Sequence, residues 1–340
     1  MKKILIWIFA AFFIAGCSST GTVKISSEPF DIAMTGDIMT GRRYMPVIEE
    51  KGPDYPFEHV RDYLKSCRVV FGNLEAPLIY EGKIPQIKKN GKKRIHLYAK
   101  AETAQGLKNA GFNIISLGNN HSIDYGQQGV TQTIEILEKQ GIEYCGLRRG
   151  GLGKANPPLV KEVNSTKVGF LCYSNVSHKK FAASADSYGT IPGLLPVFRQ
   201  DIKSARKDVD VLIVYIHWGK EWEPVREKQY RLARKIIDMG ADLIAGSHTH
   251  IFQDIEVYKG KYIFYGLGNF VFDLHREEAK YSAIVKIRVK NRSIEDVSIQ
   301  PVYLKDYRPA PVKDRQKLFD FLSGIKLINL SVKDIYKGGM

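Results

Sequence analysis

Short apolar runs alternate with helically spaced segments along most of the chain, and this alternation limits the fold more than any other feature. Apolar runs of four to seven residues predict strands that are buried on both faces, which is typical of parallel sheets covered by helices. Segments in which apolar residues recur every three or four positions predict the covering helices. The chain is therefore expected to form an α/β domain with largely parallel strand pairing.

The predicted elements follow from these two patterns. We expect strands over residues 30–36, 68–72, 112–117, 142–146, 167–173, 210–217, 242–246 and 261–266. We expect helices over residues 58–66, 101–110, 128–140, 198–207, 226–239 and 313–323. Two later segments of alternating polarity, 281–290 and 294–303, predict an antiparallel hairpin that turns at residues 290–293.

Side chains that can bind a metal stand where five of the apolar runs end. They are Asp37; Asn73 and Glu75; Asn119, Asn120 and His121; His217; and His248 and His250. Because functional residues of α/β sheets gather beyond the carboxyl ends of the strands, we expect these side chains to lie close together. The pair His248 and His250 carries the most weight, since two imidazoles one residue apart at a strand end suit a metal site better than a packed core.

This donor set fits a hydrolytic site that holds one or two divalent cations, with Mn, Zn or Fe expected. Such a site needs carboxylates, neutral imidazoles and an open position for water. The chain offers carboxylates, amide oxygens and imidazole nitrogens from Asp37, Asn73, Glu75, Asn120, His217, His248 and His250. A hydroxide activated by the metal is expected to attack a phosphoester or an acyl group. For His217 the alternative is an imidazole buried against Trp218 and Trp222 without a metal.

Three further side chains are candidates for contact with the substrate. His121 is expected to face the substrate and to donate a proton to a leaving oxygen, with Asp124 orienting its ring. The alternative for His121 is a place beside a helix N-cap, with no chemistry. Asn119 and Asn269 are candidate substrate ligands; the alternatives are a helix cap for Asn119 and a turn-stabilising side chain for Asn269.

The first residues have the pattern of a bacterial lipoprotein signal. Two lysines precede an apolar run from Ile4 to Ile14, and small residues lead to Cys17. We expect residues 1–16 to be the signal peptide and residues 17–28 to be a tether that starts at the lipidated Cys17. The site-bearing domain then covers residues 29–303, and residues 304–340 form a C-terminal extension with a helix. This interpretation places the protein in the cell envelope, lipid-anchored to the membrane on its extracytoplasmic side; the alternative is an ordinary cleaved signal.

The formal net charge of +15 favours anionic partners. Phospholipid headgroups, phosphate polymers or a polycarboxylate fit this charge, whereas nucleic acid is not expected outside the cytoplasm. The densest basic segment, residues 81–97, is either a solvated loop or a guide that steers an anion toward the site.

The remaining cysteines do not imply a disulfide framework. Cys67, Cys145 and Cys172 are odd in number and stand among apolar residues, so buried thiols are expected. A single bridge stays open as an alternative.

Six ordered motifs resemble those of the CapA family, which is named for poly-γ-glutamate capsule synthesis and is related to calcineurin-like metallophosphoesterases. Between about residues 30 and 302 they are Thr35–Met39, Gly72–Glu75, Gly118–His121 with Asp124–Gly126, His217–Gly219, Gly246–His250 and Tyr265–Phe270. The resemblance implies a four-layer α/β/β/α sandwich of the metallo-dependent phosphatase type, with the metal site at the strand ends. By this resemblance, Asp37 matches the first-motif aspartate, and Asn73 and Glu75 match the second motif. Asn120 and His121 match the Asn-His pair, and His217, His248 and His250 match the three late histidines.

Two motifs depart from the phosphoesterase pattern. The first usually reads Asp-x-His, and this chain has Asp37-Ile38-Met39. The second usually reads Gly-Asp, and this chain has Gly72-Asn73, with Glu75 two positions later. One imidazole and the usual bridging aspartate are therefore replaced, so a single metal is an alternative to two.

Two classes of function remain in competition at this level, and a phosphatase for small periplasmic esters differs from the first only in its substrate. The first is a metal-dependent hydrolase that acts in the synthesis or export of an anionic capsule polymer such as poly-γ-glutamate, together with membrane proteins of a capsule-synthesis complex. The second is a non-catalytic export subunit that binds the polyanion and retains a reduced metal site.

Overall fold

The computed structural model describes residues 28–83, 95–151, 153–177 and 179–337. The predicted signal peptide, Cys17, almost all of the tether and most of the basic segment 81–97 lie outside these residues. No helix in the described ranges is both long and apolar enough to cross a bilayer.

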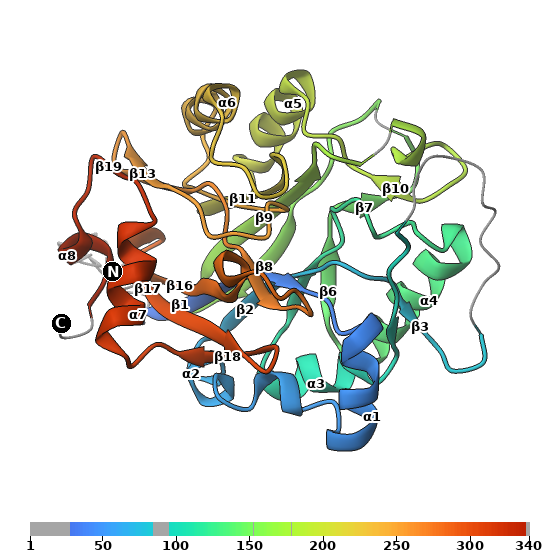
Figure 1. Cartoon of the computed structure of the whole chain (residues 1–340). Coiled ribbons are helices and arrows are strands. Elements are labelled where there is room, and N and C mark those ends of the chain that lie inside the picture. The colour runs from blue at the N-terminus through green and yellow to red at the C-terminus, as the bar shows by residue number, and fades with distance from the viewer. Residues whose placement is uncertain (1–27, 84–94, 152, 178, 338–340) are drawn as a thin grey trace, which may run out of the picture.

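Two large mixed sheets form the centre of the fold (Figure 1). The first sheet has the order β18-β17-β16-β1-β2-β5-β6, with β15 also paired to β1. Its strands are β1 (Phe30–Ile38), β2 (Val69–Leu74), β5 (Ile114–Ser116), β6 (Glu143–Cys145), β15 (Asn269–Val271), β16 (Tyr281–Lys290), β17 (Ser293–Lys305) and β18 (Arg308–Pro311).

The second sheet has the order β19-β13-β14-β12-β11-β9-β8. Its strands are β8 (Leu159–Val163), β9 (Thr166–Ser174), β11 (Val211–His217), β12 (Leu243–Ser247), β13 (Ile255–Tyr258), β14 (Lys261–Phe264) and β19 (Leu327–Ile328). Two small ladders join β3 (Leu78–Ile79) to β4 (Ala99–Lys100) and β7 (Leu147–Arg148) to β10 (Gly189–Thr190).

Helices cover the outer faces of both sheets. The helices beside the first sheet are α1 (Met45–Lys51), α2 (Arg61–Lys65), α3 (Thr103–Ala110) and α4 (Gly126–Lys139). Those on the second sheet are α5 (Leu195–Ala205) and α6 (Glu227–Asp238), at the top of Figure 1. The C-terminal part holds α7 (Arg315–Ser323) and α8 (Val332–Ile335), and short 3-10 turns are η1 (Arg42–Tyr44), η2 (Tyr55–Phe57), η3 (Lys179–Phe181) and η4 (Glu277–Lys280).

Three apolar cores separate the four layers. The middle core lies between the sheets, where Phe71 of the first sheet stacks against Phe170 and Tyr215 of the second. A second core joins the first sheet to α2, α3 and α4, and a third joins the second sheet to α5 and α6. The α/β/β/α sandwich is therefore confirmed.

The pairing is less uniformly parallel than the apolar runs predict. The central strands β1, β2, β5 and β6 are parallel, as are β9, β11, β12 and β14. Antiparallel strands complete the edges, and the prediction of largely parallel pairing is wrong there. One missed edge is the β13–β14 hairpin, whose turn residues Lys259 and Gly260 both have positive φ. Such a tight turn suits a two-residue hairpin, but Lys-Gly is a weaker sequence signal than Asn-Gly.

The predicted late hairpin is confirmed, because β16 and β17 are antiparallel and Lys290 pairs with Ser293. The C-terminal residues beyond it enter both sheets. Strand β18 pairs with β17 in the first sheet, and β19 pairs with β13 in the second. The segment that we expected as an extension therefore contributes to each half of the sandwich.

A disulfide joins the two sheets. Cys145 at the end of β6 is bonded to Cys172 in β9, and Cys67 is a buried free thiol. The expectation of buried thiols is therefore wrong for Cys145 and Cys172, which form the single bridge left open as an alternative, and is confirmed for Cys67. The bridge lies beside the loop that follows β5, since Gly146 packs against Gly118 so closely that an added Cβ would lie 2.4 Å from the Gly118 nitrogen.

Candidate metal centre

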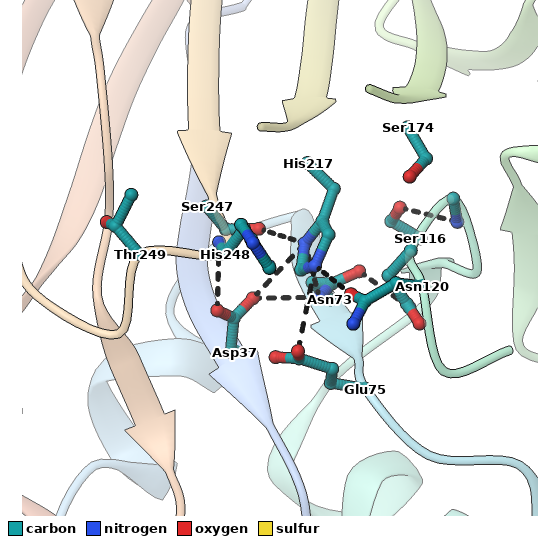
Figure 2. Close-up of polar contacts among 12 residues, drawn as sticks. Asp37, Asn73, Glu75, Ser116, Asn120, Ser174, His217, Ser247, His248 and Thr249 are labelled. Carbon is teal, nitrogen blue, oxygen red and sulfur yellow. Dashed lines mark hydrogen bonds and ion pairs between the residues drawn. The ribbon is translucent and has the colours of Figure 1, made fainter. Parts of the chain in front are cut away.

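The candidate ligands meet at one rim of the sandwich, where strands of both sheets end (Figure 2). Asp37 lies near the end of β1 and pairs in register with Asn73 of the parallel neighbour β2. His217 is the last residue of β11 and pairs with Ser247, the last residue of β12. Because the strands within each pair are parallel, their carboxyl ends deliver these side chains to the same place.

The backbone of the His-Thr-His turn is held in an uncommon conformation. His248 has φ 93° and His250 has φ 63°, both in the left-handed region that side chains other than glycine rarely adopt. Each such residue costs on the order of 1–3 kcal/mol and persists only where its surroundings enforce the conformation. Figure 2 shows His248 in the ligand cluster and Thr249 pointing away from it. The rings of His248 and His250 have centroids 6.4 Å apart.

His217 is the hub of the polar contacts. Its Nε2 lies 2.8 Å from Asn120 Oδ1 and 3.6 Å from Glu75 Oε1. Its Nδ1 lies 2.7 Å from Ser247 Oγ and 4.0 Å from Asp37 Oδ1. Its imidazole is fully buried at this hub, so the alternative of a ring that merely packs against tryptophans does not describe its surroundings.

Two overlapping groups of buried side chains have the geometry of cation sites. One group is Glu75, His217 and His248, and the other is Asp37, Glu75 and His250. Within each group the ligand atoms all lie within 4.8 Å of one another. Glu75 belongs to both groups, which is the arrangement that a bridging carboxylate would require.

The electrostatics of this cluster fit a divalent cation. Burial raises the pKa of Asp37 above its ordinary value, against the opposing influence of His250 and several hydrogen bonds. Burial, reinforced by His250 and His121, lowers the pKa of His248 to about 3, so this imidazole is neutral. His248 Nδ1 is buried with no hydrogen-bond partner among the described residues. Neutral imidazoles beside buried carboxylates are the donors that a metal ion compensates.

Asn73 contacts a candidate ligand through its amide nitrogen. Its Nδ2 donates to Asp37 Oδ1 at 2.7 Å, and its Oδ1 accepts from Asn119 Nδ2 at 3.2 Å. The side chain therefore fixes the Asp37 carboxylate in this arrangement and adds no negative charge. Its ligand role stays a prediction.

Asn119 and Asn269 lie inside the site region but point to protein atoms. Asn119 Nδ2 donates to the carbonyl of Leu74, and its Oδ1 accepts the backbone N–H of His121 at 3.0 Å. Asn269 Oδ1 lies 3.0 Å from His250 Nδ1, and Asn269 Nδ2 donates to the carbonyl of Ala279. Asn119 thus shapes the ligand loop and Asn269 orients His250, while substrate contact by either stays a prediction.

His121 and Asp124 form a close pair. His121 Nδ1 lies 2.7 Å from Asp124 Oδ2, and the same oxygen accepts the backbone N–H of Leu97 at 2.8 Å. Asp124 is almost fully buried, so its position fixes the plane and the direction of the imidazole ring. A carboxylate in this place favours the imidazolium form that a general acid needs.

Sequence reasoning missed the supporting residue Ser247 and the contact of Trp222 with His250. Ser247 contacts His217 and accepts the hydroxyl of Tyr215, so it holds a candidate ligand in place. Trp222 lies against His250 with ring centroids 5.3 Å apart. Ser247 stands within Gly246–His250, and its position at a strand end is a signal that could have identified it.

Comparison with known proteins identifies the family. The profile described as bacterial capsule synthesis protein PGA_cap matches residues 31–274. The PGA biosynthesis protein CapA of Bacillus subtilis (strain 168) is 34% identical over 312 residues, which cover 91% of this chain and 81% of that protein. The capsule biosynthesis protein CapA of Bacillus anthracis is 33% identical over 318 residues, which cover 92% and 77% of the two chains.

A solved 5′-nucleotidase precursor from Thermus thermophilus resembles the chain with a TM-score of 0.48 and 11% identity, over 87% of this chain and 59% of that one. The identification of the family depends on the profile and on the two CapA proteins, which match over most of their length. The chain belongs to the bacterial capsule synthesis protein family PGA_cap, as its six motifs predict.

Proposed function

We propose that this protein is a metal-dependent hydrolase of the cell envelope that acts on a phosphoester or acyl bond during the synthesis or export of an anionic capsule polymer such as poly-γ-glutamate. The observation that carries the proposal is the pair of overlapping ligand groups that share Glu75. The relatives named for capsule and PGA biosynthesis support the choice of pathway.

One or two Mn, Zn or Fe ions are the proposed cofactors, with Asp37, Glu75, Asn120, His217, His248 and His250 as the residues that hold them. When bound, such a cation acts as a Lewis acid that polarises a phosphoryl or acyl oxygen. A water molecule would attack the phosphorus or the acyl carbon as the bond to the leaving oxygen breaks. The protein contributes the rest. His121 donates a proton to that oxygen, and Asp124 holds the His121 ring.

We propose that the protein is anchored by a lipid at Cys17 on the extracytoplasmic side of the membrane. The lipoprotein pattern of residues 1–17 supports this placement. The disulfide between Cys145 and Cys172 supports it independently, because disulfides persist mainly in oxidising compartments. Membrane proteins of a capsule-synthesis complex are the proposed partners.

The proposal is tested with the full-length protein, purified in a non-ionic detergent. Metal content is measured first, and hydrolysis is then followed with bis(p-nitrophenyl) phosphate, p-nitrophenyl phosphate and a γ-linked glutamate decamer. We expect stoichiometric Mn, Zn or Fe and turnover of at least one of these compounds. A protein that binds none of these metals would refute the enzymatic proposal.

Asp124→Asn should lower kcat about 10- to 100-fold while the metal content stays at the parent value, since second-sphere partners typically have effects of this size. The asparagine keeps the shape but removes the charge that supports the His121 imidazolium. His121→Asn should lower kcat at least as much, and the double variant should fall little further because the two residues act as a unit. Additive losses would show that Asp124 acts independently of His121.

A second candidate function is a non-catalytic subunit that binds the polyanion and assists its export. The neutral Asn73 favours it, because the amide stands 2.7 Å from Asp37 where an additional carboxylate would strengthen metal binding. The two candidates differ in whether a metal and turnover are present in the purified protein.

Asn73→Asp should raise the affinity for Mn²⁺ about tenfold, roughly 1.4 kcal/mol, because it adds a charged oxygen beside Asp37. In a chelator the same variant should unfold more easily than the parent, since two buried carboxylates then repel each other. Metal titration and thermal unfolding measure both effects. Gln128→Glu, on the exposed face of α4, is a matched control for the added charge. Unchanged Mn²⁺ affinity would contradict a functional cation site beside Asp37.

A further inference from the structure

A recess lies outside the candidate metal centre. It has a volume of about 420 Å³ and lies between α1, the segment that follows β15, and the turn from β17 to β18. Its lining combines cationic and aromatic side chains, including Lys51, Tyr55, His275, Lys280, Tyr303 and Lys305. We call it the lysine pocket.

Cationic side chains outnumber acidic ones in the lining of the lysine pocket. Three lysines line it, and Asp306 is the one acidic side chain among its lining residues. Lys51 pairs with Glu50 at 2.9 Å and Lys280 with Glu277 at 2.8 Å, and both glutamates stand outside the lining. Lys305 is exposed, so its ammonium group is accessible from solvent.

A continuous series of contacts leads from this pocket to the metal centre. His275 contacts Arg43, whose Nη1 lies 2.6 Å from His275 Nε2. Asp273 then accepts the backbone N–H of Arg43 at 3.3 Å and forms an ion pair with Arg42. The Arg42 guanidinium lies 5.9 Å from the centre of the Phe272 ring.

Phe272 completes the series, because its ring lies against His250 with centroids 4.8 Å apart. A further guanidinium stands beside the same ligand: Arg276 lies 4.5 Å from the ring of Trp222, which packs on His250. Three exposed arginines, Arg42, Arg43 and Arg276, therefore stand beside the contacts that join the pocket to His250.

The backbone at Arg42 is also constrained. Its φ is 50°, in the region that favours glycine, and the ion pair with the almost fully buried Asp273 holds the side chain there. A non-glycine residue persists in such a conformation only where its surroundings enforce it. The position of this guanidinium is therefore set by the protein.

We propose that the lysine pocket is a subsite for carboxylate groups of an extended polyanionic substrate whose scissile bond lies at the metal centre. This inference rests on the proposed function and adds a substrate-binding role that the metal ligands do not supply. The volume suits one or two residues of such a chain rather than a large folded partner. The lysines bind the carboxylates, and the three arginines neutralise the negative charges on the part of the polymer that extends toward His250.

Lysine is suited to this task because its ammonium group is a mobile point charge that tolerates changing positions of an anion along a flexible polymer. The tyrosine rings that line the pocket add flat apolar surface for the methylene groups between the carboxylates. Because the lysines attract the polymer through its negative charges, salt should screen the attraction and weaken binding strongly. An uncharged polymer would gain nothing from the lysines.

The test is equilibrium binding of a fluorescent γ-linked glutamate decamer to the full-length protein in detergent and chelator. The double variant Lys51→Ser with Lys305→Ser should weaken binding about tenfold at 50 mM salt and should reduce its salt dependence. Lys228→Ser with Lys235→Ser is the matched control. It removes the same charge from exposed positions of α6, on the outer face of the second sheet, and should bind like the parent.

Equal binding by the parent and the pocket variant would overturn the proposal, as would equal weakening in the control variant. A γ-linked glutamine decamer should bind neither protein, and polyphosphate is included to separate the two kinds of anion. A loss that affects polyphosphate but not the glutamate decamer would overturn the assignment to carboxylates. Because the measurement uses chelated protein, it stays informative when no hydrolysis is found, so failure of this subsite and failure of the catalytic proposal are distinguishable.

Discussion

Replacing Asp37 by asparagine should abolish stoichiometric metal binding and lower the hydrolysis of bis(p-nitrophenyl) phosphate on the order of 10³-fold, since loss of a direct ligand exceeds the effect of its supporting partners. Asp37 is fully buried, belongs to one of the two ligand groups and is fixed by Asn73 and by the backbone N–H of His248. The amide keeps the size of the carboxylate but removes the charge that holds a cation.

The stability of the metal-free Asp37→Asn variant shows whether the substitution removes a metal ligand or disrupts the fold. Burial raises the pKa of Asp37, so the folded state holds the proton more tightly than the unfolded state and the ionised carboxylate opposes folding at neutral pH. Asparagine removes the free-energy cost of burying the charge, which stabilises the folded state. It also loses one hydrogen-bond acceptor, which destabilises the folded state by about 1–3 kcal/mol. In chelator the melting temperatures of the two proteins should therefore be similar.

Addition of metal should then distinguish the two proteins. A ligand at 100 times its dissociation constant stabilises the folded state by about 2.7 kcal/mol, so the parent should melt at a higher temperature and Asp37→Asn should not respond. Asp31→Asn is the matched control on the same strand, where Asp31 pairs with Arg288 and Lys286 away from the centre. An equal metal-induced shift in Asp37→Asn would contradict the assignment of Asp37 as a ligand.

Removing the disulfide with Cys145→Ala and Cys172→Ala should destabilise the protein by roughly 3 kcal/mol, as expected for a bridge that closes a loop of this length. The two cysteines are 27 residues apart in sequence and join the two sheets. The loss should also lower activity, because the neighbouring Gly118 begins the loop that carries Asn120 and His121.

Urea unfolding with and without dithiothreitol measures this effect. The reduced parent should unfold at the midpoint of the double variant, and dithiothreitol should not change the double variant further. Cys67→Ala, which removes the buried free thiol, serves as the control and should keep the sensitivity to reductant. A parent whose midpoint is the same in both conditions would show that the bridge does not stabilise the folded state.

Much of the fold could be predicted because a strand that is buried on both faces has a continuous run of apolar residues. β11 and β12 read as continuous apolar runs that stop at a polar residue, and both their ends and the direction of their pairing followed from that pattern. The amphipathic α6 was equally clear, since Ala233, Ile236 and Ile237 form one buried stripe. The pattern of apolar residues therefore predicts where the strands that carry the ligands end.

Features that depend on distant partners were not accessible from the sequence. α1 is short and was missed, and the edge strand β8 has alternating exposure that gives no apolar run. The pairing of Cys145 with Cys172 depends on how the two sheets face each other, which no local pattern encodes. The role of Asn269 beside His250 likewise follows from register between β15 and β1.

The order of strands in the first sheet has a consequence for how the chain acquires its structure. The first described strand, β1, lies between β2 and β16, and Phe30 pairs with Val289 near the other end of the chain. Neither sheet is complete before the last described strands, β18 and β19, have been synthesised. Such high contact order makes folding slow and largely post-translational. A newly made polypeptide of this topology is therefore expected to remain without its complete sandwich during most of its synthesis.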